Sequence, residues 1–469
     1  MKQNWRLFWI GLVILLIGSV AAYLVQTSGG VRIKDVRFVG ANGNLQSGLL
    51  YVPPGVTAEN KAPAILAVHG YINTREVQSG FAIEYSRRGY VVLSIDQTGH
   101  GYSEGAAFSA GFGGPAALQF LRTLDIVDPQ NIGMEGHSMG GWTVLAAAAT
   151  YPDDYKSIVL EGSSVGAPFA AEGNAEWPRN VSVVFSAYDE FSSLMWGVDK
   201  ADEVEQSPKL MAFFNSDVPV EEGKIYGDIK TGSARVLWQP PVTHPGDHLS
   251  RAAIGHSIDW FAQTLDGGRS LPADNQIWFY KELGTLIGMI GFVVFILGTL
   301  KGLLSLPWLR DLQSAPVEAA HQTRGVKWWG LMLFSALFPV LNYYPLFNLA
   351  ETLFPASPLF PQTITSQVAF WAVINGVVAA LLGLVIRSQP VRFSVDVARS
   401  LVLAIAVVFV AYMSAVMVDF FLKVDFRFWF VGVKLLTAER FPIALVYLVP
   451  FTIYFVLATR ALHSGLSVA

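Results

Sequence analysis

The sequence predicts an α/β domain, with a mostly parallel sheet covered by helices on both faces, joined to an α-helical transmembrane domain. Between residues 31 and 266, short β-branched runs alternate with helix-like stretches, and charged residues are well spread. From about residue 277 onward, long apolar runs are broken only by short polar loops. Charged residues make up 14% of the chain, against about a quarter in soluble proteins. We therefore expect a membrane anchor over 1–28, the α/β domain over 29–270, and a membrane domain of about five transmembrane helices over 271–469.

The composition excludes several kinds of site. The 469 residues carry a net charge of −4, and basic residues are scattered rather than gathered in a stripe, so nucleic acid is not an expected partner. The chain has no cysteine, which excludes disulfides, thiolate metal sites and cysteine nucleophiles, and leaves the redox compartment open. We expect neither a cofactor nor a metal ion.

The N-terminal apolar run is long enough to cross a bilayer. Residues 7–25 follow the basic residues Lys2 and Arg6, and a helix of about 19 residues reaches roughly 28 Å. The alternative is a cleaved signal peptide, since Ser19-Val20-Ala21 provides a small-residue cleavage site. The length of the run and the membrane segments that follow favour an uncleaved anchor.

Five further spans are expected in the C-terminal part, and tryptophan and tyrosine residues lie near several of their ends, where amphipathic rings favour the interface. The spans are roughly 279–300, 328–348, 368–386, 400–421 and 441–459. Their centres hold few ionisable groups. This favours an anchoring or lipid-access role over ion-coupled transport.

Basic residues divide the loops into two sets. The loops before the first span, between the second and third, and between the fourth and fifth carry Lys2, Arg6, Lys301, Arg310, Arg324, Lys327, Arg387, Arg392 and Arg399. The 349–367 loop has no Lys or Arg. The positive-inside rule then predicts both termini in the cytoplasm and the α/β domain outside a plasma or inner membrane. One loop disagrees, because 423–440 carries four cations on the predicted outer side; we interpret 426–431 as an interfacial segment whose cations reach lipid headgroups.

The α/β domain contains short apolar runs typical of buried parallel strands. They are 64–68, 91–95, 131–135, 157–160, 181–185 and a last strand from Ala234 to about Val242. Residues 32–39 and 46–52 flank the turn 41–44 and predict an antiparallel hairpin at the sheet edge.

A candidate nucleophile lies between a strand and a helix. Gly136-His137-Ser138-Met139-Gly140-Gly141 follows the short strand 131–135 and precedes the helix-forming run 142–150. A serine on a sharp strand-to-helix turn needs small residues on both sides, because neighbouring backbone passes close by. The helix N-terminus behind it favours developing negative charge. This context makes Ser138 the predicted nucleophile.

The stretch from His69 to Gly141 resembles the α/β-hydrolase superfamily, particularly esterases, dienelactone hydrolases and prolyl-oligopeptidase-like enzymes. The shared motifs are His69-Gly70-Tyr71, Asp96 to Ser103, Val127-Asp128-Pro129 and the serine turn. Many members have arginine where Thr98 stands, so this turn must be held differently here. The resemblance covers about half the chain and does not extend to the C-terminal spans.

The resemblance implies the partners of Ser138. The oxyanion hole would be formed by the backbone N–H groups of Met139 and Tyr71. The acid would follow the strand 181–185, where Asp189 is the first candidate and Glu190 the second.

The base would follow the last strand, as a neutral imidazole that accepts the serine proton. His244 fits this place best, and His248 is the alternative. His256 lies within the expected closing helix 250–265 and is interpreted as a packing residue. His100 and His137 are interpreted as structural or pocket-lining residues.

These residues predict a membrane-bound serine hydrolase that cleaves a carboxylic ester or acyl bond, on a small-molecule or lipid substrate. An acyltransferase or a serine peptidase would use the same groups, and a non-enzymatic receptor-like domain is a further alternative. Only residues 166–180 are available for a lid ahead of the acid-bearing strand. We therefore expect the outer ends of the spans or the 349–367 loop to cover the pocket. The sequence leaves the substrate and the oligomeric state open.

Overall fold

The computed structural model describes residues 4–313, 325–385 and 396–466. Four basic residues used to predict the topology lie outside these ranges: Lys2, Arg324, Arg387 and Arg392. The chain forms two compact units, one of Met1–Thr299 with Phe409–Lys434 and one of Leu300–Val408 with Leu435–Ala469. The first unit therefore contains the whole α/β domain together with parts of the membrane-type helices.

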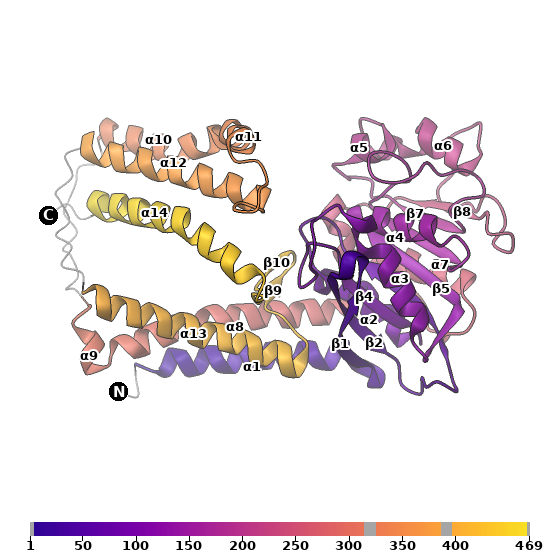
Figure 1. The fold of residues 1–469 in the computed structure, drawn as a ribbon, viewed down its shortest axis with the longest axis horizontal. Coiled ribbons are helices and arrows are strands. Elements are labelled where there is room, and N and C mark those ends of the chain that lie inside the picture. Colours follow the sequence, from indigo (N-terminus) through magenta and orange to yellow (C-terminus); the bar gives the residue numbers. More distant parts are fainter. Residues whose placement is uncertain (1–3, 314–324, 386–395, 467–469) are drawn as a thin grey trace. The chain divides into compact units, whose positions relative to one another are not determined.

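An eight-stranded sheet forms the centre of the α/β domain, in the order β1-β2-β4-β3-β5-β6-β7-β8 (Figure 1). β1 pairs antiparallel with β2, β2 pairs antiparallel with β4, and every later pairing in the sheet is parallel. The strands are β1 (Arg32–Val39), β2 (Leu45–Val52), β3 (Ala62–Val68), β4 (Val91–Asp96), β5 (Val127–His137), β6 (Ser157–Glu161), β7 (Val181–Val184) and β8 (Arg235–Trp238). This topology confirms the predicted fold class.

Helices cover both faces of the sheet because the strands are apolar on both faces. On one face α3 (Gly114–Thr123) and α4 (Met139–Thr150) pack over a core that includes Leu66, Leu93 and Met134. On the other face α2 (Ser79–Arg87) and α7 (Arg251–Thr264) pack over Ile65, Val92 and Val159. Alternate residues of one strand thus enter different cores, as the two-residue period of a strand requires.

The last strand is shorter than the sequence predicts. β8 ends at Trp238 rather than near Val242, because Pro240 and Pro241 have no N–H to donate to a ladder. The chain rejoins the sheet edge at a bridge between Tyr188 and Thr243. Between β7 and β8 lies an insertion that the sequence analysis did not assign, with α5 (Ser192–Trp196), the 3₁₀ helix η5 (Ala201–Gln206) and α6 (Pro208–Phe214).

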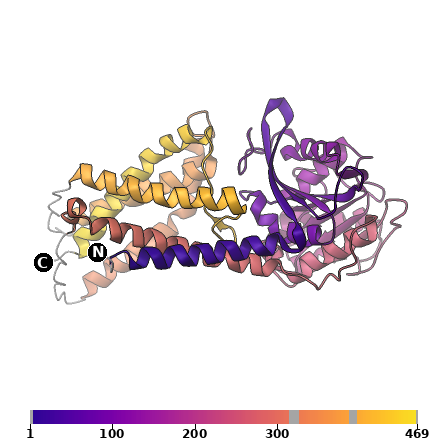
Figure 2. The ribbon, with the colours of Figure 1, turned by 90° about the horizontal axis from the view of Figure 1, so that it is seen from below.

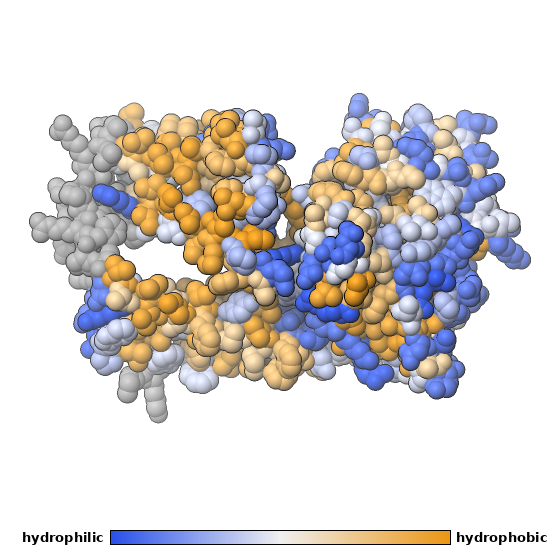
Figure 3. Space-filling model, viewed as in Figure 1, coloured by the Kyte–Doolittle hydropathy of each residue, from blue (hydrophilic) through white to orange (hydrophobic). Residues whose placement is uncertain are grey.

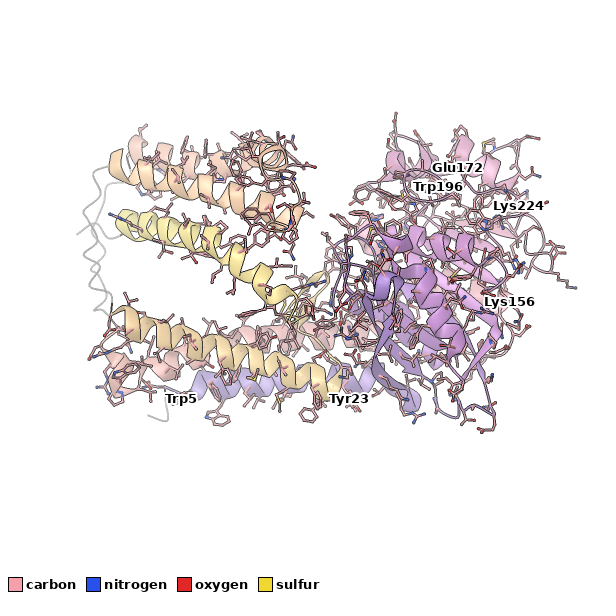
Figure 4. All side chains as sticks on the ribbon, in the orientation of Figure 1. Trp5, Tyr23, Lys156, Glu172, Trp196 and Lys224 are labelled. Atoms are coloured by element: carbon pink, nitrogen blue, oxygen red, sulfur yellow. The ribbon has the colours of Figure 1, made fainter. Side chains whose placement is uncertain are left out.

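Two apolar helices of the first unit pack closely together. α1 (Arg6–Gln26) lies along α8 (Trp278–Leu304) in Figures 1 and 2, and Trp5 and Tyr23 mark the two ends of α1 in Figure 4. A Cβ added at Gly18, Gly284 or Gly291 would overlap backbone atoms of the facing helix. Glycines therefore bring the two backbones together, as in tightly packed membrane helices.

The start of α8 is fixed to the α/β domain. The carboxylate of Glu84, on α2, accepts hydrogen bonds from the N–H groups of Ile277 (2.7 Å) and Trp278 (3.0 Å). A carboxylate at a helix N-terminus satisfies donors that have no partner within the helix and complements the helix dipole.

Within the described residues, five helices are long and apolar enough to cross a membrane, and a bent helix pair raises this number to six if the pair is one span. Besides α1 and α8 they are α12 (Thr363–Val385), α13 (Val397–Leu422) and α14 (Arg440–Leu466). Their outward surface in Figure 3 is largely hydrophobic, whereas the α/β domain shows a mixture of polar and apolar residues.

The predicted span 328–348 is instead a pair of helices that meet at Asn342 at an angle of 47°. They are α10 (Val326–Leu341) and α11 (Tyr343–Leu353). Pro345 cannot donate to the carbonyl one turn earlier, so it cannot continue the helical bonding across the junction. The side chain of Asn342 pairs instead with that of Asn375 on α12, at 3.1 and 3.3 Å.

A small hairpin follows α13. Its strands β9 (Arg427–Phe428) and β10 (Val431–Gly432) pair antiparallel. The interpretation of 426–431 as a segment whose cations reach lipid headgroups is wrong for Arg427, because Asp425 and Glu76 bind it. Lys434, three residues beyond that segment, is bound by Glu76 of the α/β domain. The distances from Arg427 to Asp425 (2.6 Å) and from Lys434 to Glu76 (2.7 Å) show that both cations have carboxylate partners within the protein.

Candidate active site

Ser138 occupies the sharp turn between β5 and α4 that the sequence predicts. Its backbone has φ 55° and ψ −121°, a strained conformation for a residue with a side chain. A Cβ on Gly136 would overlap the backbone of Gly140, and a Cβ on Gly140 would overlap the carbonyl oxygen of Val68. The glycines of the motif are therefore required by close backbone packing.

Two backbone segments lie beside Ser138, one that begins α4 and one that leads to Tyr71. Met139 is the first residue of α4, so its N–H has no partner within the helix. A Cβ on Gly70 would lie 3.2 Å from Ser138 Cβ, so the chain leading to Tyr71 passes directly beside the serine. Both predicted oxyanion residues thus follow segments that flank Ser138.

A buried side chain braces the loop that carries Tyr71. The side-chain amide of Gln97 donates to the carbonyl oxygen of His69, and its oxygen accepts from Thr143 Oγ1 on α4 at 2.8 Å. The N–H of Gln97 donates to His69 Nε2 at 3.1 Å. Burial, aided by the nearby His100, lowers the pKa of His69 to about 4, so its imidazole is neutral and can accept this bond.

His244 and Asp189 form a hydrogen-bonded pair. His244 Nδ1 lies 2.7 Å from Asp189 Oδ2, and both side chains are buried. The other oxygen of Asp189 accepts from the N–H of Phe191 at 2.8 Å. Glu190 instead accepts from the backbone N–H of His244 at 2.9 Å. The first candidate acid therefore contacts the imidazole, and the second holds the main chain of the same residue.

The His244 loop is tied to the serine turn. His137, which precedes Ser138, has its Nε2 2.9 Å from the carbonyl oxygen of His244, and the two rings are 4.6 Å apart. The N–H of Ser138 donates to the carbonyl oxygen of Glu161 at 2.8 Å, and a Cβ on the next residue, Gly162, would lie 2.9 Å from His244 Nδ1. Ser138 and the His244–Asp189 pair are thus brought to one edge of the sheet.

His248 is buried without a hydrogen bond on either ring nitrogen within the described part of the chain. Its ring packs 4.1 Å from His137 and 6.2 Å from Phe81. Burial and the neighbouring His244 lower the pKa of His248 to about 3, so it stays neutral at physiological pH. Unlike His244, it contacts neither candidate acid through a hydrogen bond.

His256 and His100 each lie beside an aromatic ring. His256 stacks on Trp238 at 4.0 Å with an angle of 10° between the rings. His100 lies 5.8 Å from the ring of Tyr71.

Three buried carboxyl groups lie behind the site, and the sequence analysis did not identify them. Glu135 accepts two hydrogen bonds from Gln78, at 2.8 and 3.0 Å, and Asp247 accepts one from Ser186. Both carboxyl oxygens of Glu161 have no partner among the described residues. Burial raises the pKa of all three, and their mutual repulsion raises that of Glu161 further. Two of the three could have been found from the sequence, because Glu135 and Glu161 each follow directly on an apolar strand run.

The turn after β4 is held by its own aspartate. Asp96 accepts from the N–H groups of Arg75 and Tyr102, both at 2.9 Å. The guanidinium of Arg75 approaches the same carboxylate at 3.8 Å. An arginine from another loop therefore stands beside the turn in which related enzymes have arginine at the position of Thr98.

A cluster of aromatic rings lies next to the predicted oxyanion residue. Tyr71 contacts Phe108 (5.3 Å), which stacks on Phe169 (5.5 Å), and Phe169 contacts Trp142 (5.0 Å) and Phe112 (6.2 Å). Tyr71, Phe108 and Phe169 are 40 to 47% exposed. The exposed rings of Tyr71, Phe108 and Phe169 form an accessible apolar surface backed by the buried Trp142 and Phe112, and these five residues are named here the aromatic patch.

No group of three or more His, Asp or Glu side chains in the described ranges is arranged to hold a metal ion. The expectation that the protein uses no cofactor stays a prediction.

Comparison with known proteins bears on the fold of the α/β domain. Residues 63–192 match the family described as alpha/beta hydrolase fold. A monoacylglycerol lipase of Mycolicibacterium smegmatis is 28% identical over 182 residues, which are 37% of this chain and 60% of the relative. The quorum-quenching protein AidA of Acinetobacter baumannii is 35% identical over 122 residues, 24% of this chain and 39% of that protein.

Among solved structures, an esterase of Pyrococcus furiosus is similar with a TM-score of 0.36 and 17% identity, over 50% of this chain and 94% of the esterase. The chain spans 60% and 39% of the lengths of the two curated relatives. The sheet topology and the family match together show the α/β-hydrolase fold, and one curated relative is a monoacylglycerol lipase.

Proposed function

We propose that this α/β-hydrolase-fold protein is a membrane-bound serine hydrolase that cleaves carboxylic esters with an apolar acyl group. Ser138 is the nucleophile, His244 the base, Asp189 the acid, and the N–H groups of Tyr71 and Met139 form the oxyanion hole. The observation that carries the proposal is the 2.7 Å contact between His244 Nδ1 and Asp189 Oδ2 beside a strained serine turn. Such a pair orients an imidazole for proton transfer from a serine.

The proposed reaction proceeds through an acyl-enzyme. Ser138 Oγ bonds to the carbonyl carbon while His244 Nε2 accepts its proton, and the two N–H groups stabilise the oxyanion. The carbon–oxygen bond to the alcohol then breaks, and His244 donates its proton to the departing oxygen. Water, deprotonated by His244, attacks the acyl carbon, the acid leaves, and the proton returns to Ser138. Asp189 accepts the Nδ1–H throughout and stabilises the imidazolium.

The aromatic patch supports an apolar acyl group. It begins at Tyr71, whose N–H is one proposed oxyanion donor, so a chain bound at the carbonyl lies next to exposed rings. Exposed aromatic surface of this kind gains free energy when an apolar ligand covers it. We propose the bilayer as the protein's partner, and the helices that are long and apolar enough to cross a membrane support this, because amphipathic esters gather in a bilayer.

The proposed topology keeps both termini in the cytoplasm of a plasma or inner membrane and the hydrolase domain outside. The contacts of Lys434 and Arg427 with Glu76 support one part of it, because they put the loop between α13 and α14 on the same side as the α/β domain. The carboxylates bound to Arg427 and Lys434 lessen the objection that the four cations of 423–440 raise against the positive-inside assignment.

The test compares full-length Ser138→Ala with Ser193→Ala, a control on an exposed residue of α5. Membranes containing each variant are treated with a fluorescent fluorophosphonate, and hydrolysis is measured for 4-nitrophenyl esters of increasing chain length. We expect Ser138→Ala to lose labelling and turnover while Ser193→Ala keeps both, and longer acyl chains to lower KM. Persistent labelling of Ser138→Ala would refute the nucleophile, and faster cleavage of amide substrates would favour a peptidase.

A further inference from the structure

The hairpin after α13 reaches the two loops that carry the proposed catalytic groups. The 423–434 hairpin, defined as residues Lys423 to Lys434, belongs to the same compact unit as the α/β domain. Its strands β9 and β10 pair through Arg427 with Gly432 and Phe428 with Val431. It is more than 170 residues beyond His244 in sequence, so its contacts are purely tertiary.

One side of the hairpin binds the loop that begins at Tyr71. Lys434 Nζ lies 2.7 Å from both carboxylate oxygens of Glu76. Arg427 donates to Asp425 at 2.6 Å and to Thr74 Oγ1 at 3.3 Å, and it approaches Glu76 at 3.8 Å. Thr74 and Glu76 are three and five residues beyond Tyr71.

These charges are buried, so their geometry is restricted. Arg427 is 4% exposed and Glu76 7%. Burial alone would raise the pKa of Glu76, but Lys434, Arg75 and Arg427 outweigh it and hold that pKa well below its usual value. A buried charge left without its partner is strongly destabilising, so these contacts resist separation.

The tip of the hairpin binds the loop of the proposed base. Trp429 Nε1 donates to the carbonyl oxygen of Pro245 at 3.2 Å. The ring of Phe430 packs 5.6 Å from the ring of His248. Pro245 follows His244 directly, and both histidines lie in the 3₁₀ helix η6 (His244–Leu249).

We propose that the 423–434 hairpin is a positioning element of the active site, which holds the His244 loop against the Tyr71 loop. Trp429 fixes the main chain next to His244, and Lys434 with Arg427 fixes the segment after Tyr71. The hairpin between α13 and α14 is then required for full turnover. This inference rests on the proposed function, because it depends on the proposed roles of His244 as the base and of Tyr71 as an oxyanion donor.

The consequence for catalysis follows from the geometry. A base and an oxyanion hole on separate loops act together only if both loops keep their relative position within a fraction of an ångström. Loosening the hairpin should therefore reduce steps that need the complete site, which are acylation and fluorophosphonate capture. The binding of a short ester, and hence its KM, should change little.

The test uses the full chain in detergent micelles, with Trp429→Ala, Trp429→Phe and the matched control Phe428→Ala. Phe428 is the neighbouring hairpin residue and is 50% exposed. We expect Trp429→Ala to lower kcat for a short soluble ester and the fluorophosphonate labelling rate by about tenfold or more. Trp429→Phe, which keeps an aromatic ring but loses the N–H, should fall between Trp429→Ala and the control, and KM and Tm should stay near those of the control.

A second set of variants keeps the inference testable if Trp429→Ala folds poorly. Lys434→Gln should lower kcat, and Glu76→Gln should lower it at least as much, because Glu76 also binds Arg75 and Arg427. The double variant should resemble Glu76→Gln, because the contact between Glu76 and Lys434 is broken in both and the effects do not add. Unchanged kcat in both Trp429→Ala and Lys434→Gln would overturn the proposal. So would a rise confined to KM for long esters, which would make the hairpin a substrate contact, or a loss of activity that only parallels a loss of Tm. Ser138→Ala run in parallel separates these outcomes from failure of the proposed function.

Discussion

Replacing Asp189 with asparagine should move the proton of the neutral His244 imidazole from Nδ1 to Nε2 while leaving the fold intact. In the structure, Asp189 Oδ2 faces His244 Nδ1 at 2.7 Å, and Oδ1 accepts from the N–H of Phe191 at 2.8 Å. An asparagine that keeps the bond from Phe191 must turn its NH₂ group toward His244. The imidazole then carries its proton on Nε2, and it can no longer accept the proton of Ser138.

The expected loss of kcat is large because an imidazole with its proton on Nε2 cannot accept the proton of Ser138 in any turnover. By analogy with the serine–histidine–aspartate template, kcat should fall about 10⁴-fold, which corresponds to about 5.5 kcal/mol of transition-state stabilisation at 1.36 kcal/mol per tenfold change in rate. Glu190→Gln is the matched control, because a glutamine oxygen can still accept from the N–H of His244. Its kcat should stay within a few-fold of the wild type.

The assay is hydrolysis of a short 4-nitrophenyl ester by the full-length protein, with Tm measured for each variant. Equal activities of Asp189→Asn and wild type, or a larger loss in Glu190→Gln than in Asp189→Asn, would refute the assignment of the acid.

Three further predictions follow from the same structure. His244→Ala should match Ser138→Ala in lost turnover, whereas His248→Ala should keep substantial activity; the opposite order in a steady-state assay would move the base to His248. Glu161 holds a proton in the folded protein that the unfolded chain releases, so wild-type stability should fall as pH rises above the ordinary carboxyl pKa of 4.5. Glu161→Gln should remove this pH-dependent loss of stability. The Tm of Glu161→Gln minus the Tm of the wild type should therefore be greater at pH 8 than at pH 5, and an equal difference at both pH values would contradict the raised pKa of Glu161. Protease added to intact cells or outer-membrane-permeabilised spheroplasts should cut within residues 30–275; cleavage only in inside-out vesicles would reverse the topology.

Local patterns were sufficient for the strands and for the serine turn. Every predicted parallel strand appears in the sheet, because a buried strand needs a run of apolar residues whatever surrounds it. The glycines around Ser138 were likewise readable, since only small residues allow β5 and α4 to pass so close to neighbouring backbone. The choice between Asp189 and Glu190 was only a preference, because the two are adjacent and their different orientations depend on the loop around them.

Contacts between distant segments left no local pattern to read. Lys434 and Glu76 are 358 residues apart, and nothing near either residue indicates the other. The sequence therefore predicted an interfacial segment over 426–431, and it did not predict that the hairpin contacts the α/β domain. The bend at Asn342 was missed for a related reason, because hydropathy measures apolar length and is insensitive to the hydrogen bonds that Pro345 removes.

The central claim is that Ser138 forms the covalent intermediate, and mapping the adduct tests it most directly. Full-length protein in native membranes is labelled with a fluorophosphonate, digested, and analysed by tandem mass spectrometry. The account predicts one phosphonylated peptide, modified on Ser138, whose labelling is slowed by a competing long-chain ester. An adduct on another residue, or ester hydrolysis by the purified protein with Ser138 unmodified after exhaustive treatment, would contradict it.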